Sequence, residues 1–479
     1  MLESRNFYIE TNANVKDYML DVFEKHSDVR KVKAALSEIG SGRLSTTHIK
    51  EALVMSYVDS GESEKALELA HSFNAVDPNA NMHNLILKTL LSSWGFTQAI
   101  FLEESKSWAS KYAYESNLAL SSHRNERPRI GLVCDYGSTV FGENAIFPMA
   151  LGLSKSGFDV YYYNFEKATI SCDIEHLSCL NVHDKTSEQL SNLIKSNRID
   201  ILVDLNGRLR EHHRLGVFAR RSAPIQINYF NLVGTMGMSN YDYVIADEVQ
   251  VAEQDDQYYV EKVLRLPCGV NGAFSFKRDV PIGFPESASG RVFTFASFNA
   301  FFKCNTLLLQ TWAEILSRVP NSRLVIKCHE TSRDRVIRKI ASTFTRAGVD
   351  LSRIMIEGWS SLNALRKQYA HVDLCLDTFP YSGGSSTLNA LWQGVPVLTW
   401  AGDGWRARSS ASMMMASGLT EFIVGSRQEY IEKAVELAIN RHSAAEARHY
   451  LANNVTENLY FNPEVVYQDL AKCLLGLLE

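Results

Sequence analysis

The chain lacks long apolar runs, an apolar leader and closely paired cysteines. No window of about 18 residues is uninterruptedly apolar, so we expect no transmembrane helix and no membrane insertion. The N-terminal stretch MLESRNFYIETNANVK carries charge early and has no apolar core, which argues against a secretory signal. The eight cysteines form no CxxC pair and several lie in apolar runs, as is typical of buried free thiols in a reducing cytosol. These absences predict a cytoplasmic protein.

A basic excess and a metal motif are also missing. The net charge is −5 at pH 7 and the pI is about 6.3, so we expect no nucleic-acid partner. Cys172 and Cys179, with His176 between them, could be read as metal ligands, but nothing supplies a matching second half. No Asp-x-Asp motif has the setting that a metal site needs. We therefore expect no metal and no bound cofactor.

The first 125 residues lack clear strands and predict helices. Residues 50–78 follow the spacing of a tetratricopeptide helix pair, with small and aromatic residues at the expected positions. A single repeat cannot bury its own face, so it must stack on helices expected at about 15–40 and 83–115. The positions that carry this pattern are Ala52, Tyr57, Gly61, Ala66, Ala70, Phe73 and Pro78.

The rest of the chain alternates strands with helices, which predicts α/β architecture with parallel, doubly wound sheets. At 479 residues, roughly two to four domains are expected. We expect a helical region over 1–125, a first α/β domain over 126–285 and a second over 286–479. The expected strands are 129–135, 158–163, 199–204, 225–229, 243–247, 292–296, 323–327, 353–356, 373–377 and 397–400. Helices are expected at 144–156, 186–196, 304–318, 332–347, 410–417, 427–440, 443–453 and 464–478.

Residues 373–408 stand out as a candidate anion site. The apolar strand 373–377 is followed by a turn at Pro380, and the residues GGSS then begin a helix. Glycine lets a ligand approach the backbone, and the unpaired amides of a helix N-terminus favour negative charge. The alternative is a Gly-rich turn that only solves a packing problem.

Three stretches carry a resemblance to a known family. The segment DTFPYSGGSSTLNALWQGVPVLTWAG, the segment ILVDLNG with FARRSAPIQINYFNLVGTMGMSNYDYVIAD, and Phe298–Lys303 with the pattern Phe-Asn-x-x-x-Lys resemble the O-linked N-acetylglucosamine transferases. The Trp-Ala-x-x-Tyr of residues 108–112 resembles the end of that family's linker. The resemblance implies a GT-B fold: two Rossmann-like domains preceded here by a short, all-α, tetratricopeptide-like region.

The same resemblance implies roles for individual residues. Lys303 is expected to stabilise the diphosphate that leaves from a nucleotide sugar, and its alternative is a solvated surface lysine. The phosphates are expected at the amides and hydroxyls of the GGSS turn, and Asn389 falls where relatives grip the ribose with Asp. The full set of expected donor-binding residues is Lys303, Asn299, Gly383, Gly384, Ser385, Ser386, Asn389, Leu365, Arg408, Val233 and Gly234.

Three positions depart from the family pattern. Thr139 and Leu365 each stand where relatives have a histidine, at the active site and against the nucleobase, and Gly384 replaces a histidine found in some relatives. The proton acceptor therefore has no family assignment. We expect Asp135 or Glu143 as catalytic base. The further candidates are Asp204, Glu211, His212 and His213.

The sequence thus predicts an inverting, metal-independent glycosyltransferase. The expected donor is UDP-N-acetylglucosamine or UDP-glucose, and the expected acceptor is a protein Ser/Thr hydroxyl. Alternatives are a transferase acting on asparagine, a glycan or a small molecule, and a catalytically inactive, partner-binding subunit of a glycosyltransferase complex. Residues 1–80 are the expected surface for a partner subunit or self-association.

Overall fold

The computed structural model describes most of the chain. Among the described residues, no helix combines the length and apolar character needed to cross a bilayer. The described residues are 13–27, 29–38, 45–113, 125–134, 142–165, 174–209, 215–230, 233–267, 280–285, 291–328, 333–454, 456 and 461–479.

The chain forms two compact units, and each draws on separated stretches of sequence. Unit 1 comprises Met1–Phe96, Asp279–Gly402 and Leu419–Asn453. Unit 2 comprises Thr97–Arg278, Asp403–Gly418 and Asn454–Glu479. The units are groups of residues that contact one another, and they do not correspond to single stretches of sequence. The sequence-based division into the domains 1–125, 126–285 and 286–479 stays a prediction.

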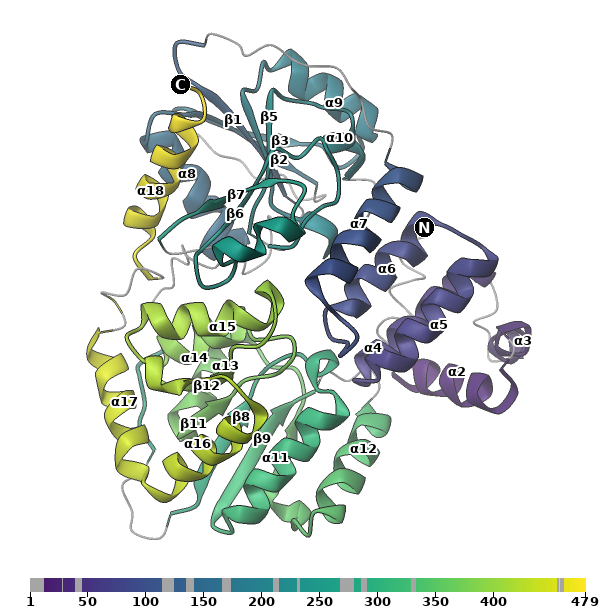
Figure 1. Ribbon diagram of the computed structural model, residues 1–479, viewed down its shortest axis with the longest axis vertical. Coiled ribbons are helices and arrows are strands. Elements are labelled where there is room, and N and C mark those ends of the chain that lie inside the picture. Colours follow the sequence, from purple (N-terminus) through teal and green to yellow (C-terminus); the bar gives the residue numbers. More distant parts are fainter. Residues whose placement is uncertain are drawn as a thin grey trace. The chain divides into compact units, whose positions relative to one another are not determined.

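The helical part of unit 1 begins with α2 (Ala13–His26) and α3 (Val29–Glu38) and continues through α4 (Thr46–Asp59), α5 (Ser63–Val76) and α6 (Ala80–Leu90). Side chains cap two of these helices: Ser45 accepts from the amide of His48, and Asn79 from that of Met82. Helices α4, α5 and α6 pack side by side (Figure 1), and the small Ala66 and Ala70 are buried between them. The helix pair expected at 50–78 is confirmed.

The sheet of unit 1 has six parallel strands in the order β10-β9-β8-β11-β12-β13. The sheet is wound outward in both directions from β8 and β11, so the strand order reverses between these two neighbours. Its strands are β8 (Phe293–Ser297), β9 (Ser322–Lys327), β10 (Ile354–Glu357), β11 (Leu374–Leu376), β12 (Val397–Trp400) and β13 (Ile423–Val424). The helices of this part are α11 (Thr306–Arg318), α12 (Arg333–Arg346), α13 (Leu362–Gln368), α14 (Ser385–Trp392), α16 (Arg427–Ile439) and α17 (Arg441–Asn454).

Unit 2 contains a seven-stranded parallel sheet in the order β3-β2-β1-β4-β5-β6-β7. Helix α18 lies along α8 (Figure 1), where a Cβ on Gly152 would lie 2.4 Å from the ring of Tyr467. The strands are β1 (Arg129–Cys134), β2 (Asp159–Asn164), β3 (Leu177–Asn181), β4 (Ile201–Asp204), β5 (Ile225–Asn228), β6 (Tyr243–Ala246) and β7 (Lys262–Arg265). The α-helices are α7 (Gln98–Tyr112), α8 (Phe147–Lys155), α9 (Ser187–Ser196), α10 (Leu215–Ala219), α15 (Trp405–Ala416) and α18 (Pro463–Gly476).

The predicted fold class is confirmed, and all ten expected strands are present within a residue or two at each end. Three strands were not predicted: β3, β7 and β13. All three lie at an edge of their sheet. An edge strand of an otherwise buried sheet needs fewer apolar residues than a central strand, and β3 and β7 are partly exposed along most of their length.

One expectation about the cysteines is wrong. The described cysteines that are free are Cys134, Cys304, Cys328, Cys375 and Cys473, and four of them are buried. Cys179, in β3, is instead disulfide-bonded. The absence of a CxxC pair was the reason to expect free thiols, and it carries no information about pairing between more widely spaced cysteines.

Two cations of α12 attach the helical region to the α/β part of unit 1. Arg335 donates from Nε to Glu62 at 2.7 Å and from its Nη atoms to Glu24. Lys339, one helical turn further on, donates to the carbonyls of Ser60 at 3.2 Å and Gly61 at 2.7 Å. Burial by itself would raise the pKa of Glu24 and Glu62, but Arg335, together with Lys65, and with Tyr57 at Glu24, outweighs burial and lowers both pKa values.

Replacing Arg335 by methionine should lower the free energy of unfolding at pH 7 by about 1 to 3 kcal/mol, because the half-buried Glu62 loses a half-buried charged partner. The part of this loss that comes from Glu24 is screened by solvent. A carboxylate whose folded-state pKa is depressed stabilises the fold above its unfolded pKa, and this contribution is lost as the pH falls through the folded-state pKa. The difference between wild type and Arg335→Met should therefore shrink below about pH 4.5.

Urea denaturation of both proteins at pH 7 and pH 4 measures this. Arg318→Met is the matched control, because Arg318 pairs with Glu432 on an exposed surface and should contribute little. Equal losses for the two variants at pH 7 would contradict the assigned role of Arg335.

Candidate functional site

The candidate site lies where the strand order of the unit 1 sheet reverses. Strand β8 leads into Asn299 and the short turn Phe301–Lys303, and β11 leads into Asp377 and the segment before α14. Because β8 and β11 are parallel neighbours, both connections leave from the same edge. Ligands of doubly wound sheets bind at the carboxyl ends of the strands, at such a reversal.

A buried carboxylate shapes the segment between β11 and α14. Asp377 is 1% exposed, and its Oδ1 accepts from the amides of Thr378 and Gly383, both at 2.8 Å. Its Oδ2 accepts from the hydroxyl of Thr399 at 2.8 Å, which ties the segment to β12. The sequence identified Asp377 only as the end of a strand. An acidic residue that ends an apolar strand just before a glycine turn was the available signal.

The two glycines of this segment have different surroundings. A Cβ on Gly383 would lie 2.3 Å from Oγ1 of Thr387 and 2.9 Å from Oδ1 of Asp377, so only glycine fits. A Cβ on Gly384 would meet nothing within 4 Å. Gly384 is the N-cap of α14, so the amides of Ser385 and Ser386 begin the helix beside open space. The expected arrangement of the GGSS turn at a helix N-terminus is present.

Lys303 meets this segment from the other connection. Its Nζ donates to the carbonyl of Ser382 at 2.6 Å and lies 4.1 Å from the ring centroid of Tyr381. Burial lowers the pKa of Lys303 to about 8, and the charge of Asp377 acts in the opposite direction. The structure therefore brings together the lysine and the glycine turn, which are about 80 residues apart in the sequence.

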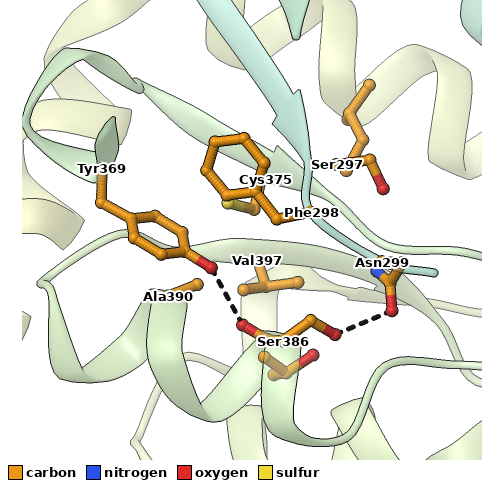
Figure 2. A pocket seen from close by; sticks show the side chains of 10 residues that line it. Ser297, Phe298, Asn299, Tyr369, Cys375, Ser386, Ala390 and Val397 are labelled. Carbon is orange, nitrogen blue, oxygen red and sulfur yellow. Dashed lines mark hydrogen bonds between the residues drawn. The ribbon is translucent and has the colours of Figure 1, made fainter. Parts of the chain in front are cut away.

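Asn299 links the two connections. Its Oδ1 accepts from the hydroxyl of Ser386 at 2.7 Å, and its Nδ2 lies 3.4 Å from Oδ1 of Asp377. Figure 2 shows Ser386 between Asn299 and Tyr369. The hydroxyl of Tyr369 donates to the Ser386 carbonyl at 3.3 Å. The small pocket beside them is lined by Ser297, Phe298, Asn299, Tyr369, Cys375, Leu376, Ser386, Thr387, Ala390 and Val397.

Arg366, which the sequence did not indicate, contacts Asn389, the residue expected to bind the ribose. Asn389 donates from Nδ2 to the carbonyl of Ser385 at 2.7 Å, and its Oδ1 accepts from Nε of Arg366 at 3.3 Å. Arg366 is 3% exposed and lies on α13, directly after the half-buried Leu365. Only the fold could reveal the Arg366–Asn389 hydrogen bond, because nothing in the sequence distinguishes Arg366 from an arginine on the surface.

Val233, Gly234 and Arg408 belong to unit 2, whereas the residues described above belong to unit 1. Val233 is buried, and a Cβ on Gly234 would lie 2.6 Å from the ring of Trp405. Arg408 donates from Nη1 to Oδ2 of Asp255 at 2.7 Å. The roles of these three residues in binding a donor stay predictions.

The candidate bases are largely outside the described residues. This holds for Asp135, Glu211, His212 and His213, and for the side chain of Glu143; Thr139, where relatives have a histidine, also lies outside the described residues. Asp204 is described and is fully engaged: Oδ1 accepts from the amides of Asn206 and Gly207, and Oδ2 accepts from the hydroxyl of Tyr241 at 2.6 Å. We assign Asp204 a structural role. In the described part of the chain, no three His, Cys, Asp or Glu side chains gather closely enough to hold a metal ion.

Substituting the two glycines separately should distinguish packing from binding. Gly383→Ala should destabilise the protein by about 1 to 3 kcal/mol, because the new methyl group meets Thr387 and Asp377. Gly384→Ala should cost less stability but should weaken the UDP binding that the sequence resemblance predicts, because its methyl group enters the open space at the start of α14. Thermal unfolding and calorimetric titration with UDP measure both effects. Equal stability losses, or unchanged UDP affinity in Gly384→Ala, would contradict these assignments.

Comparison with solved structures shows the fold. A lysine-to-methionine mutant of the O-GlcNAc transferase of Thermobaculum terrenum matches 99% of this chain and 95% of that chain with a TM-score of 0.80, at 23% sequence identity. The expected GT-B fold with a helical N-terminal region is confirmed.

Comparison with curated proteins finds plant relatives. The chain is 32% identical over 269 residues to a probable UDP-N-acetylglucosamine–peptide N-acetylglucosaminyltransferase SPINDLY of Hordeum vulgare, covering 56% of this chain and 28% of that protein. It is 32% identical over 285 residues to the protein of Arabidopsis thaliana named SEC, with the same enzyme name, covering 57% and 28%. The chain therefore spans less than a third of the length of these relatives.

The sequence profile described as Glycosyl transferase family 41 matches residues 155–270 and 282–470, which is more than half of the chain. Its second part includes Lys303, Asp377 and the glycine turn. The predicted family is confirmed, and this chain belongs to glycosyl transferase family 41.

Proposed function

We propose that this chain is an inverting, metal-independent glycosyltransferase that moves N-acetylglucosamine or glucose from a UDP-sugar to a Ser/Thr hydroxyl of a protein. One observation carries the proposal: Lys303, from the β8 connection, reaches the glycine turn that begins α14, at 2.6 Å from the Ser382 carbonyl. A cation, a glycine turn and a helix N-terminus together form a site for a diphosphate. Family membership and the names of the plant relatives support the sugar-nucleotide donor and the protein acceptor.

The chemistry follows from charge. The acceptor oxygen attacks the anomeric carbon as the bond to the diphosphate oxygen breaks, so negative charge grows on the diphosphate. The ammonium of Lys303 and the first amides of α14 would stabilise that charge, without need of a metal. Attack on the face opposite the leaving group inverts the anomeric centre. The proton of the acceptor hydroxyl passes to a base, for which Asp135 and Glu143 remain our candidates.

The remaining roles complete the proposed donor site. Asn389 would bind the ribose, supported by its hydrogen bond from Arg366, and the apolar side chain of Leu365 would contact the nucleobase. Val233, Gly234 and Arg408, which belong to unit 2, are retained as proposed donor-binding residues on the sequence resemblance alone. A role of residues 1–80 in binding a partner subunit or a second copy is retained as a secondary proposal.

Lys303 should make UDP binding depend on pH. A bound diphosphate favours the charged lysine, so affinity should be highest below the pKa of about 8 and should fall by up to about tenfold per pH unit above it. A terminal phosphate has a second pKa near about 6, so UDP itself stays ionised over this range. Lys303→Met should bind UDP weakly at pH 7 and should show no such fall.

Calorimetric titration with UDP from pH 7 to 9.5 measures this dependence. Lys433→Met is the control, because Lys433 pairs with Glu436 on the same helix and should keep the wild-type profile. A flat profile in the wild type would sink the role given to Lys303.

A nucleotide-sugar panel tests the activity itself. With UDP, GDP and dTDP sugars, we expect one UDP-sugar to raise the melting temperature by mass action and to be hydrolysed slowly without acceptor. Lys303→Met should lose both effects. Wild type should keep both in excess EDTA. NMR of the glycosylated product should show inversion at the anomeric carbon. A donor that binds but never turns over, with any acceptor tried, would favour the inactive partner-binding subunit.

A further inference from the structure

The helical region of unit 1 touches the residue that follows Lys303. The turn between α4 and α5 contains Gly61, whose φ is +69°. A Cβ on Gly61 would lie 2.2 Å from the carbonyl oxygen of Cys304. No side chain fits between them, so the backbone of the helical turn rests directly on the backbone that carries Lys303.

This turn is held in place from a second side. Helix α12 donates from Lys339 to the carbonyls of Ser60 and Gly61, and from Arg335 to Glu62. These bonds engage three consecutive residues of the turn. The turn is therefore fixed between α12 and the Lys303 connection, and a displacement of Gly61 would be transmitted to Cys304.

A second contact reaches the glycine turn. The ring of Trp94, in the segment after α6, lies 6.2 Å from the ring of Phe379 and 6.2 Å from that of Trp400. Phe379 in turn packs edge-on against Trp400 and Tyr430. Phe379 lies four residues before Gly383, in the segment shaped by Asp377, so Trp94 packs against the base of the predicted phosphate turn.

The two contacts are joined by one side chain. Asn305, which follows Cys304 and caps α11, donates from Nδ2 to the carbonyl of Phe379 at 2.7 Å. Lys303 itself bonds Ser382 at the other end of that segment. The backbone under Gly61 and the backbone under Trp94 are thus parts of one hydrogen-bonded assembly.

We propose that Gly61 and Trp94 are positioning residues of the diphosphate site, so that the helical region sets the geometry of Lys303 and of the glycine turn. This rests on the proposed function only for the identity of the ligand. The helical region is then a working part of the donor site. A change in the docking of these helices would alter donor affinity, and bound donor would stabilise their docking to the same extent.

Gly61→Ala tests the first contact, and Gly348→Ala is its matched control. Gly348 has a φ of +73° and no neighbour within 4 Å of an added Cβ, so both variants share the backbone strain but only Gly61→Ala presses on Cys304. The readout is the pH at which Lys303 becomes half-reactive toward trace acetic anhydride, measured by mass spectrometry of the labelled peptide. Among the described residues, the titratable groups that act on the charge of Lys303 are Asp377 and Cys304, and neither variant removes them.

We expect wild type and Gly348→Ala to share one midpoint, near pH 8, and Gly61→Ala to shift it upward by at least half a unit as the lysine becomes more exposed. UDP affinity should fall at least threefold in Gly61→Ala and stay unchanged in Gly348→Ala. If Gly61→Ala keeps the wild-type midpoint while losing stability, the contact is packing alone and the proposal is overturned.

Trp94→Leu provides the second variant should Gly61→Ala not fold. It should shift the same midpoint and weaken UDP, whereas Val76→Ala, at an exposed position of the same helical region, should do neither. A wild-type midpoint in Trp94→Leu would overturn the proposal. The labelling midpoint needs no ligand, so it decides the positioning roles even if wild type binds no UDP, an outcome that would instead defeat the proposed function.

Discussion

The buried carboxylate of Asp377 is the constraint on which the rest of the site depends. Two backbone amides and a threonine hydroxyl converge on it, so the chain must turn back on itself between β11 and α14. That turn leaves room for no side chain at Gly383 and brings the start of α14 to the edge where the strand order reverses. A carboxylate buried this deeply is stable only with such partners, and the turn therefore follows from satisfying its charge.

A positive charge, that of Lys303 in the connection after β8, lies against this turn. Lys303 donates a hydrogen bond to the Ser382 carbonyl and lies over the Tyr381 ring, while burial lowers its pKa. A cation held in a partly dry site interacts more strongly with an arriving anion than it would in water. The same burial makes the lysine sensitive to small displacements of its backbone, which is why the support of Gly61 under Cys304 matters.

The helical region and the α/β part of unit 1 form one compact body. Repeats of this kind are usually regarded as surfaces for other proteins, yet here one turn and one tryptophan reach the two backbone segments that make the site. Arg335 and Lys339 fix the turn through charge and hydrogen bonds, and the Trp94 contact is aromatic. Two contacts of different chemistry at two ends of one site make accidental packing a poor explanation.

The sequence by itself determined the central strands, the helix pair at 50–78, the glycine turn at the start of α14 and the candidate Lys303, because each depends on local periodicity or on a short motif. The tertiary structure alone decided the edge strands, the Arg366–Asn389 pair, the role of Asp377 and the contact of Gly61 with Cys304. It also decided which helices join which unit: α15 and α18 belong to unit 2 although the elements before them in the chain belong to unit 1, and α7 belongs to unit 2 although α4, α5 and α6 belong to unit 1. These features join residues far apart in the chain, and local sequence cannot specify contacts that exist only once the distant partner has folded.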